Sequence, residues 1–493
     1  MTPVVHSHAT EPTDPGGPSL FRSLRPAQRE VLSRLGSAFS AEGYELALVG
    51  GIVRDILLER PLLNELDFAT SAPPAVTRVL GESAGAASVF DIGERFGTIG
   101  LVFEIPTEPD ESDQVIAEIT TYRSEHYPDA SRHPAVQLGG TLIDDLSRRD
   151  FTINAIAADA LTGERIDPFD GQADLYQNRI RAVGNPDLRF EEDPLRLLRA
   201  ARFAAQLGFT VDEETLAAMT RQAQSLSRIS KERILMELTK LLTGEFASHG
   251  LRVLLETGLL TAAIPELTRF ADEALGQQPL PHREKALWEH TLRVVDRVPP
   301  RHLLRWSALL HDAAKPQTRT VDPRGEVHFF GHEREGAELA RHILGRLKAD
   351  KTTQANVART VELHFRPATY ESDWTDSAVR RLMLEAGDVL EDLLDLAAAD
   401  VTSAREHKQR EAAARVSGLR DHIARLEAEH ALSELKSPLD GDELMAMFDR
   451  PPGRWIAVVK EHLRNLVIDG ELAPDDRESA EQIAREMVAS GEA

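Results

Sequence analysis

Residues 45–55 read ELALVGGIVRD, and this stretch decides how the N-terminal part of the chain folds. The run ELALV is typical of a buried strand, and IVRD opens a helix directly after Gly50 and Gly51. Paired glycines between a strand and a helix let backbone N–H groups come close to phosphate oxygens. A tight turn with a purely structural role fits the same residues equally well. The glycines alone therefore predict only a candidate phosphate-binding turn.

Two carboxylates follow the turn at a spacing of two residues. Residues 64–68 read NELDF, which places Glu65 and Asp67 on one face if the segment is a strand. This arrangement suits Mg²⁺ ions held on a nucleotide triphosphate, whereas a solvated strand edge is the alternative. Glu118, in the strand-like AEITTYR, could complete the cluster if its strand lies alongside, which the sequence does not decide.

Outward from this stretch, the chain divides into a mixed N-terminal part and a helical remainder. A length of 493 residues predicts several packed units. Strand-like and helical runs mix between residues 27 and 121, and from about residue 193 the apolar period is helical almost to the end. We therefore expect an α+β multidomain fold, with strands and helices mixed in the head and all-α domains after it. The predicted divisions are a disordered lead-in (1–25), a head (26–165), a helical neck and body (166–275), a third domain (276–405) and a helical tail (406–493).

The composition excludes several classes of protein. The chain has no cysteine, so disulfide scaffolds, thiol catalysis and cysteine-ligated zinc are excluded, and any metal site uses His, Asp and Glu. No apolar run is long enough to span a membrane and no signal-peptide pattern is present, so we expect a cytoplasmic protein without a membrane partner. A net charge of −24 argues against a general basic coat for nucleic acid. Residues 151–350 are nearly neutral, with 27 bases and 29 acids, and a groove for a polyanion is expected there.

A further motif extends the turn and the carboxylates into a recognisable pattern. Residues 148–155 read RRDFTINA, in which arginine forks suit phosphate oxygens and asparagine can reach a sugar hydroxyl. Together, GGIVRD, ELD and RRDFTINA resemble nucleotidyltransferases of the DNA polymerase β superfamily, specifically the class II tRNA CCA-adding enzymes and bacterial poly(A) polymerases. The usual carboxylate motif there is D-x-D, so Glu65 is a departure that adds one methylene at a metal ligand. The resemblance implies a polymerase-β-like head with a small mixed sheet. In this head it implies that Glu65, Asp67 and Glu118 are catalytic, that Glu65 and Asp67 bind Mg²⁺, and that the nucleotide is bound by Gly50, Gly51, Arg54, Arg149, Asp150 and Asn154.

Residues 192–199 read EDPLRLLR and are the most informative stretch. We expect a helix that opens here, with Asp193 and Arg196 at i and i+3 on one face. An Asp acceptor beside an Arg donor matches cytosine and adenine, whereas uracil and guanine would leave buried polar groups unpaired. A simple helix cap is the alternative. In the class II family the matching E-D-x-x-R residues are taken to select the base, so the resemblance assigns that role to Asp193 and Arg196, and nucleotide binding also to Arg199 and Arg202.

A second set of residues with metal-binding chemistry lies in the helical part. Histidines occur in the runs WEHTLRVVD, LLHDAAK, FFGHEREGA and VELHFRP, the last at His364, and an aspartate ends the run EDLLDLAAAD. Imidazoles together with a carboxylate make hydrolytic metal sites. The pair in LLHDAAK resembles the HD phosphohydrolase domain, which is found fused to some bacterial CCA-adding enzymes; a metal-free structural relic is the alternative. The resemblance implies a divalent metal ion of unknown identity, held by His290, His311, Asp312, His332 and Asp400.

The resemblance implies a tRNA nucleotidyltransferase that adds CCA. A tRNA 3′-hydroxyl would attack the α-phosphate of CTP or ATP with the help of two Mg²⁺ ions, and pyrophosphate would leave. Residues 123–134, which include Arg123 and Arg132, look like the flexible loop that the family uses in switching from C to A, and the loop favours complete CCA addition. Asp170 and Gly171 resemble the motif that couples head and neck.

The expected partners are therefore tRNA, CTP and ATP, and the sequence does not indicate the oligomeric state. A poly(A) polymerase with the same head is one alternative. Another is a chain that acts mainly as an HD phosphohydrolase, which Glu65 in place of the usual aspartate suggests. The tail segment SPLDGDELMAMF could contact tRNA or serve only in packing.

Overall fold

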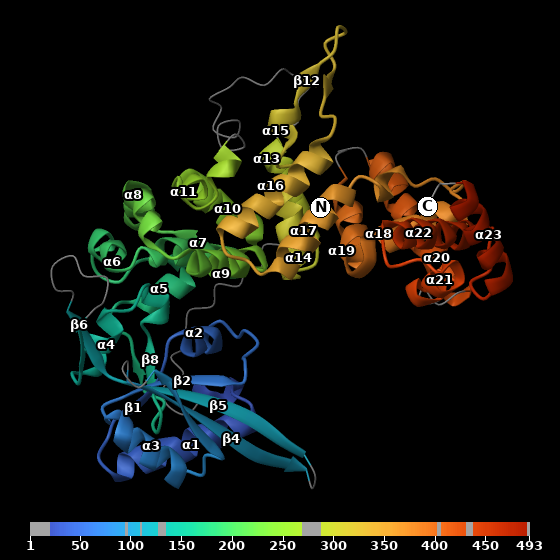
Figure 1. Cartoon of the computed structure of the whole chain (residues 1–493). Coiled ribbons are helices and arrows are strands. Elements are labelled where there is room, and N and C mark those ends of the chain that lie inside the picture. The colour runs from blue at the N-terminus through green and yellow to red at the C-terminus, as the bar shows by residue number, and fades with distance from the viewer. Residues whose placement is uncertain are drawn as a thin grey trace. The chain divides into compact units, whose positions relative to one another are not determined.

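The structure is a computed structural model of the chain, and it describes residues 20–93, 97–108, 111–126, 135–268, 287–401, 406–429 and 437–490 (Figure 1). The chain forms two compact units. Unit 1 comprises Met1–Ser230 and His249–Ala263, and unit 2 comprises Lys231–Ser248 and Ile264–Ala493. Within the described residues, no helix has both the length and the apolar character that crossing a membrane requires.

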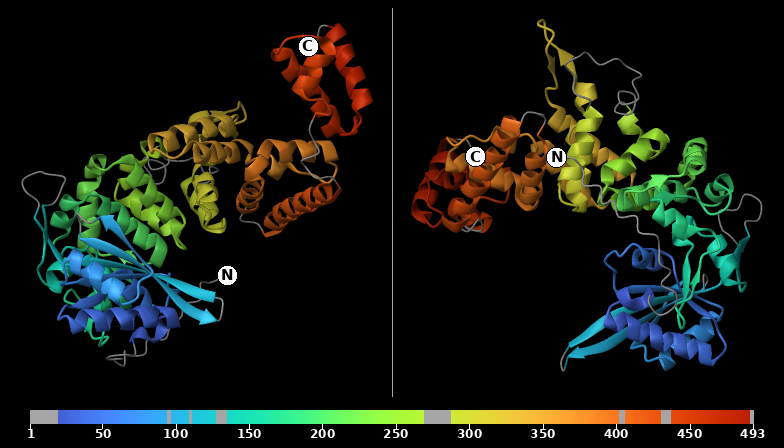
Figure 2. Two further views of the ribbon diagram at one scale, coloured as in Figure 1. Left: turned by 60° about the horizontal axis from the view of Figure 1, so that its bottom comes forward. Right: turned by 180° about the vertical axis from the view of Figure 1, so that it is seen from behind.

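A seven-stranded mixed sheet forms the head in unit 1, with the strand order β3-β4-β5-β2-β1-β8-β9. Neighbouring strands are antiparallel except β2 and β5, which run parallel. Figure 2 shows this sheet, and the long hairpin of β4 and β5, from two further directions. The strands are β1 (Leu46–Val49), β2 (Glu65–Thr70), β3 (Ser88–Gly93), β4 (Thr98–Glu108), β5 (Glu111–Thr121), β8 (Ala157–Asp159) and β9 (Arg165–Ile166).

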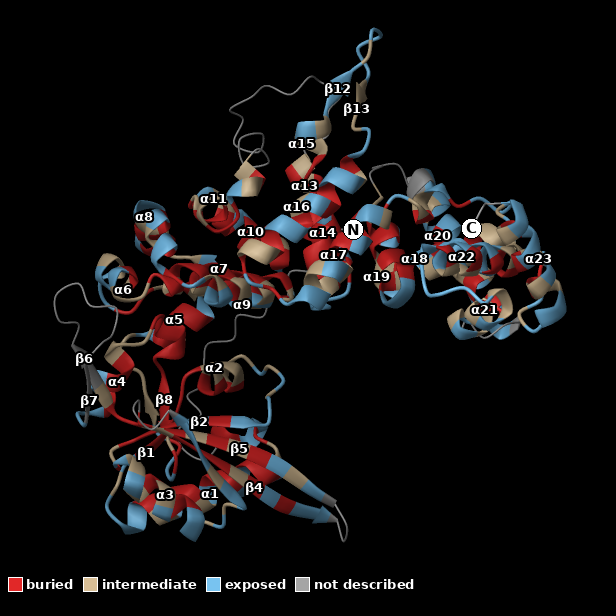
Figure 3. Cartoon of the chain, in the orientation of Figure 1, coloured by how far each residue is buried: buried red, intermediate tan, exposed pale blue. Residues whose placement is uncertain are grey.

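Helices cover both faces of this sheet. α1 (Pro26–Ala41) and α3 (Pro74–Ser83) pack together and against β4 and β5. On the other face, α4 (Leu142–Ser147) contributes to an apolar cluster with Ala47 and Val49 of β1. β1 is buried along its whole length, and Figure 3 shows buried residues concentrated along the central strands.

The ordered head begins earlier than the sequence predicts. Leu20–Ser23 forms a short 3₁₀ helix in which Leu20 and Phe21 are buried, and Leu24 is buried beside it. The predicted disordered lead-in is therefore wrong for residues 20–25, because these apolar side chains pack against α2 (Gly51–Leu57). Residues 1–19 lie outside the described part of the chain.

Helices continue unit 1 after the sheet. α6 (Pro186–Glu192) packs against α7 (Leu195–Leu207) and α8 (Glu213–Gln222). A two-residue parallel pair, β10 (Arg179–Ile180) with β11 (Thr210–Val211), joins the chain before α6 to the chain after α7. Since α6 ends at Glu192 and α7 begins at Leu195, no single helix spans residues 192–199.

The described part of unit 2 consists mainly of helices and includes a short hairpin, β12 (Thr320–Val321) and β13 (Val327–His328). The buried Trp306 donates its indole N–H to Thr239 Oγ1 at 3.0 Å, and Arg305 donates to the carbonyl of Leu242. These bonds hold α9 (Lys231–Leu242) inside unit 2, although the sequence analysis assigned its residues to the neck and body. The other helices of this part of unit 2 are α13 (Leu287–Arg297), α14 (His302–Leu310), α16 (His332–Arg346), α17 (Lys351–Leu363) and α19 (Leu390–Ala399).

Two further cores lie beyond these helices. One joins α18 (Asp376–Ala386) and α19 to α20 (Glu406–Glu429), and Leu382, Leu393 and Leu419 are fully buried in it. This core continues across residue 405, where the sequence placed the end of the third domain. The second core surrounds Trp455. It is enclosed by α21 (Gly441–Phe448), α22 (Arg454–Asp469) and α23 (Arg477–Ser490).

Candidate active sites

Three carboxylates come together on β2 and β5. Along β2, Leu66 and Phe68 are buried, and Glu65 and Asp67 project from the opposite face. The parallel register sets Asp67 directly opposite Glu118 of β5. Residues directly opposite each other project to the same face of a sheet. The sequence did not decide whether the strand of Glu118 lies beside the strand of Glu65 and Asp67. The structure pairs these two strands, as a cluster of the three carboxylates requires.

The electrostatics of these carboxylates favour a cation. Desolvation raises the pKa of Asp67 even though its side chain reaches solvent, Arg149 opposes this rise, and Glu65 adds to it. Desolvation also raises the pKa of Glu118, and the charges of Asp67 and Glu65 raise it further. Carboxylates that repel one another in this way are the oxygen ligands that hard divalent cations take. The residues present therefore fit a metal ion.

The glycine turn lies against the RRDFTINA segment. Gly50 has φ 76°, a left-handed conformation that favours glycine, and a Cβ there would lie 2.8 Å from Arg149 Nη1. Arg54 of α2 donates to Asn154 Oδ1 at 2.8 Å, although the two residues are 100 positions apart in the sequence. Gly50, Arg54, Arg149 and Asn154 therefore form one surface, and Arg149 also acts on Asp67 beside it.

Asp150 anchors this surface to the helix that follows the head. It accepts hydrogen bonds from Arg199 Nε of α7 at 2.6 Å and from Asn154 Nδ2 at 3.1 Å. Burial alone would raise the pKa of Asp150, but Arg199 and Asn154 hold it at about 2. Asp150 is therefore ionised at neutral pH, and it holds Asn154 of the head and Arg199 of α7 next to each other.

The structure places Asp193 differently from the expectation. Asp193 is extended, with φ −141° and ψ 100°, between the end of α6 and the start of α7. A residue before proline avoids the helical conformation, so Pro194 breaks the helix at this point. Asp193 Oδ1 accepts the backbone N–H of Leu195 at 3.0 Å. The expectation that Asp193 and Arg196 share one face of one helix is wrong.

Arg196 is held on the first turn of α7 by three partners. Its guanidinium donates to Glu192 Oε2 at 2.7 Å and to the carbonyls of Arg189 at 3.0 Å and Arg148 at 2.9 Å. Its charge also helps to lower the pKa of Asp150. Arg196 therefore lies at the same surface as the RRDFTINA segment.

Three arginines share an aromatic neighbour that the sequence analysis missed. The guanidinium carbons of Arg54, Arg199 and Arg202 lie 5.4, 5.5 and 4.3 Å from the centre of the Phe203 ring. A local signal existed for two of them, because positions 199, 202 and 203 fall on one face of a helix. Arg54 comes from a distant segment, and no pattern in the sequence connects it to Phe203.

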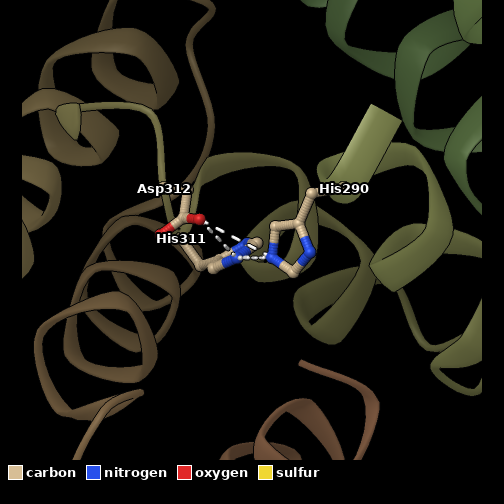
Figure 4. Close-up of side chains that lie close together, drawn as sticks. All are labelled: His290, His311 and Asp312. Atoms are coloured by element: carbon tan, nitrogen blue, oxygen red, sulfur yellow. Dashed lines mark hydrogen bonds and ion pairs between the residues drawn. The ribbon is translucent and has the colours of Figure 1, made fainter. Parts of the chain in front are cut away.

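In unit 2, a buried cluster forms at the end of α14 (Figure 4). His311 Nε2 lies 3.4 Å from His290 Nε2, which comes from α13, and 3.3 Å from Asp312 Oδ2. His290 Nε2 also lies 2.9 Å from Asp400 Oδ1, just beyond α19. The structure thus gathers four of the predicted ligands, from three separate segments.

The other oxygen of Asp312 faces a second group of ligands. His332 Nε2 lies 3.7 Å and His364 Nε2 3.9 Å from Asp312 Oδ1. His364 was singled out in the sequence with the other histidines but was not in the predicted ligand set. Asp312 therefore stands between two sets of possible metal ligands, one with His290 and His311 and one with His332 and His364.

The details of this cluster fit a metal ion. The Nδ1 atoms of His311, His332 and His364 bond to the carbonyls three residues earlier, at 2.9, 2.8 and 2.6 Å. Such bonds orient an imidazole and leave Nε2 available to a metal. Asp312 Oδ1 and His332 Nε2 are buried without a hydrogen-bond partner. Buried polar atoms normally have partners, so these two atoms point to a ligand between them.

Protons should compete with metal at this centre. Burial alone would lower the pKa of His311, but Asp312 raises it to about 9, while burial and the charge of His311 lower that of His364 to about 4. A ligating imidazole must be unprotonated, so a metal ion held by His311 would displace its proton. We expect the affinity for Mn²⁺ to rise about tenfold per pH unit between about pH 7 and about pH 9 and then to level off. Competition with a chromophoric chelator measures it, and equal affinities across this range would contradict the expectation.

One predicted element falls partly outside the described residues. Arg123 begins β6 (Arg123–His126), which pairs with β7 (Ala135–Leu138). Arg132 and the remainder of residues 127–134 are not described. The role of the loop in switching from C to A therefore stays a prediction.

Known proteins match the chain along most of its length. Family models described as "Poly A polymerase head domain", "Probable RNA and SrmB- binding site of polymerase A" and "HD domain" match residues 46–181, 208–270 and 287–405. The CCA-adding enzyme of Geobacillus sp. (strain WCH70) is 32% identical over 431 residues, which are 87% of this chain and 90% of that protein. The chain belongs to the CCA-adding enzyme family.

Other CCA-adding enzymes also match the chain along nearly its whole length. That of Enterococcus faecalis (strain ATCC 700802 / V583) is 31% identical over 457 residues, 92% of this chain and 93% of that protein. The crystal structure of the Bacillus stearothermophilus CCA-adding enzyme in complex with CTP aligns with a TM-score of 0.68 at 26% identity, covering 95% of this chain and 99% of that one. The likeness confirms the predicted fold class, an α+β head followed by helical domains, as that of a CCA-adding enzyme.

Proposed function

We propose that the chain is a tRNA nucleotidyltransferase that adds C, C and A to the tRNA 3′ end from CTP and ATP. Membership of the CCA-adding enzyme family over nearly the whole length supports this, as do the CTP complex of the Bacillus stearothermophilus relative and the match to an RNA-binding model. The observation that carries the proposal is the meeting of three carboxylates with the arginine-lined surface of the RRDFTINA segment.

The carboxylates and arginines divide the chemistry between them. Glu65 and Asp67 would hold Mg²⁺, with Glu118 beside them. Such ions stabilise the charge on the attacking and leaving oxygens of phosphoryl transfer. Arg54 and Arg149 would bind phosphate oxygens through their planar forks. The tRNA 3′-hydroxyl would then attack the α-phosphate, and pyrophosphate would leave without a covalent enzyme intermediate.

Base selection is assigned to Asp193 and Arg196. The Arg196 guanidinium is already fixed by Glu192 and two backbone carbonyls, so it would not need ordering when a nucleotide binds. Asp193 lies in the break between α6 and α7. This break, rather than a helix face, would present the acceptor that the amino groups of cytosine and adenine require.

A direct assay tests the proposed function. Purified protein is mixed with labelled CTP and ATP, Mg²⁺, and a tRNA that lacks its 3′ CCA. We expect addition of two C residues and one A, after which synthesis stops. Failure to add C would contradict the proposal. Long A runs on unrelated RNA would instead favour poly(A) polymerase, which the names of the matched relatives do not favour.

Glu65 permits a test of the alternative that the head is inactive. We expect Glu65→Asp to change the rate of CTP addition by less than about tenfold. Glutamate on the exposed face of β2 already carries the charge and oxygen ligands that a cation needs. Single-turnover addition of labelled CTP measures the rate. Activity that appears only in Glu65→Asp would show that the natural head is disabled.

We also propose that the HD domain is a metal-dependent phosphohydrolase. A cavity of about 450 Å³ lies over the metal-ligand cluster, and its lining includes Lys315, His332, His364 and Asp400. Lys315 Nζ holds Asp312 Oδ2 at 2.7 Å, so its ammonium group lies where a phosphate ester would meet the metal centre. Hydrolysis of p-nitrophenyl phosphate and of 2′,3′-cyclic nucleotides with added Mn²⁺, Ni²⁺ or Mg²⁺ tests this. Hydrolysis that survives both chelation and His311→Ala would contradict it.

A further inference from the structure

We propose that Phe203 is a positioning residue for nucleotide addition, because its ring holds the guanidinium groups of Arg54, Arg199 and Arg202 ready for the incoming nucleotide. The inference rests on the proposed nucleotidyltransferase function of unit 1. It concerns how the head and α7 keep three positively charged guanidinium groups close together around one ring.

The ring itself is firmly placed. Phe203 is 5% exposed on α7, and Phe151 of the RRDFTINA segment is fully buried against it. The two ring centres are 5.7 Å apart at an interplanar angle of 83°, an edge-to-face contact that favours one orientation of each ring. Phe203 therefore has a fixed position relative to the surface that contains Asp150 and Asn154.

Three guanidinium groups surround this ring from two segments of the chain. Arg54 comes from α2 of the head, and Arg199 and Arg202 come from α7, at 5.4, 5.5 and 4.3 Å from the ring centre. Arg54 is further fixed by Asp55 and Asn154, and Arg199 by Asp150. All three arginines therefore share the Phe203 ring as a neighbour.

An aromatic ring beside an arginine differs from a carboxylate in its effect on the charge of the arginine. The face of an aromatic ring attracts a cation without neutralising it. Each carboxylate that pairs with an arginine instead cancels one unit of the charge that phosphate oxygens would meet. Arg54 and Arg199 already pair with Asp55 and Asp150, so Phe203 attracts the three guanidinium groups without adding a further carboxylate that would cancel more of the positive charge met by a triphosphate.

This role predicts which kinetic constant changes. Ordered arginines bind phosphate without a further loss of side-chain freedom, so their positioning strengthens nucleotide binding. CTP and ATP share the triphosphate, and loss of the ring should weaken both equally. Because the arginines contact the nucleotide in the ground state and in the transition state alike, KM should change much more than kcat.

Phe203→Met tests the proposal, since methionine fills similar volume without a π face. We expect the KM for both CTP and ATP to rise about tenfold, with kcat within about threefold of wild type. Phe203→Tyr keeps the ring and should retain both constants within about twofold. The matched control is Phe209→Met, because Phe209 is also 5% exposed and, among the described residues, no lysine or arginine lies over its ring.

Each outcome decides the proposal. An unchanged KM in Phe203→Met, or an equal rise in Phe209→Met, would overturn it. Thermal unfolding is recorded for every variant, and Phe203→Leu replaces the methionine variant if that protein does not unfold cooperatively. Calorimetric titration of the full chain with CTP gives the same comparison without catalysis. A wild-type protein that binds CTP but adds none to tRNA would therefore contradict the proposed function and still allow the role of the ring to be measured.

Discussion

Replacing Asp67 by asparagine should lower the rate of CTP addition to truncated tRNA at least about a thousandfold. Asparagine keeps the shape of the side chain but removes a charged metal ligand from the centre of the group formed with Glu65 and Glu118. Single-turnover incorporation of labelled CTP in the presence of Mg²⁺ measures the loss. Higher Mg²⁺ concentrations should restore little of it, because the missing ligand and not the supply of metal limits the rate.

Stability separates this catalytic effect from damage to the fold. The fold raises the pKa of Asp67, so ionised Asp67 disfavours the metal-free folded state at neutral pH, and the neutral asparagine should not lower its melting temperature. The control is Glu104→Gln on the exposed side of β4 in the same sheet, which should leave the rate of CTP addition within about twofold of wild type. A residual rate in Asp67→Asn within tenfold of wild type would mean that the carboxylates do not hold the metal.

Replacing Asp312 by asparagine should remove the metal from the HD domain and reduce phosphate ester hydrolysis more than about a hundredfold. Asp312 is fully buried and faces both groups of histidines, so its loss affects every ligand set at once. Metal content by mass spectrometry and hydrolysis of p-nitrophenyl phosphate measure the two effects. Addition of CTP to tRNA should stay within about twofold of wild type, since the residues proposed for that reaction belong to the other unit.

A second carboxylate provides the control for Asp312. Asp322 lies beside Glu326 and His328 on the β12–β13 hairpin, another set of possible metal ligands, but these residues are only partly buried or exposed. Asp322→Asn should leave both metal content and hydrolysis unchanged. Loss of the metal in Asp322→Asn, with retention in Asp312→Asn, would place the metal on the hairpin and contradict the proposed HD centre.

Local spacing predicted part of the first site well. The i, i+2 spacing of Glu65 and Asp67 was sufficient to place both side chains on one face, because the period of a strand is two. The position of Glu118 depended on which strands pair, and no local pattern carries that information. The same limit applies to Arg54, whose contacts with Asn154 and Phe203 cross 100 and 149 positions of sequence.

The errors have equally specific causes. The sequence predicted a helix that opens at residues 192–194 and includes Asp193, but Pro194 keeps the preceding residue out of the helical conformation, so α6 ends at Glu192 and α7 begins at Leu195. His364 was named among the candidate histidines but not assigned as a ligand, because the order of histidines along the chain does not show which of them the packed helices bring to Asp312. The lead-in was extended too far because Leu20, Phe21 and Leu24 follow a polar segment directly and are too few to show a period.

The shared core of α18, α19 and α20 extends beyond the segment that the HD family model matches. That match ends at residue 405, yet Leu419, Ile423 and Leu426 of α20 belong to the same buried apolar cluster as Leu393 of α19. A protein shortened to residue 405 would expose that apolar surface to water on the helix that leads directly to Asp400. The proposed hydrolytic centre therefore should not function in another protein as the matched segment alone, and we expect a descendant that lost α20 to lose metal binding at that centre as well.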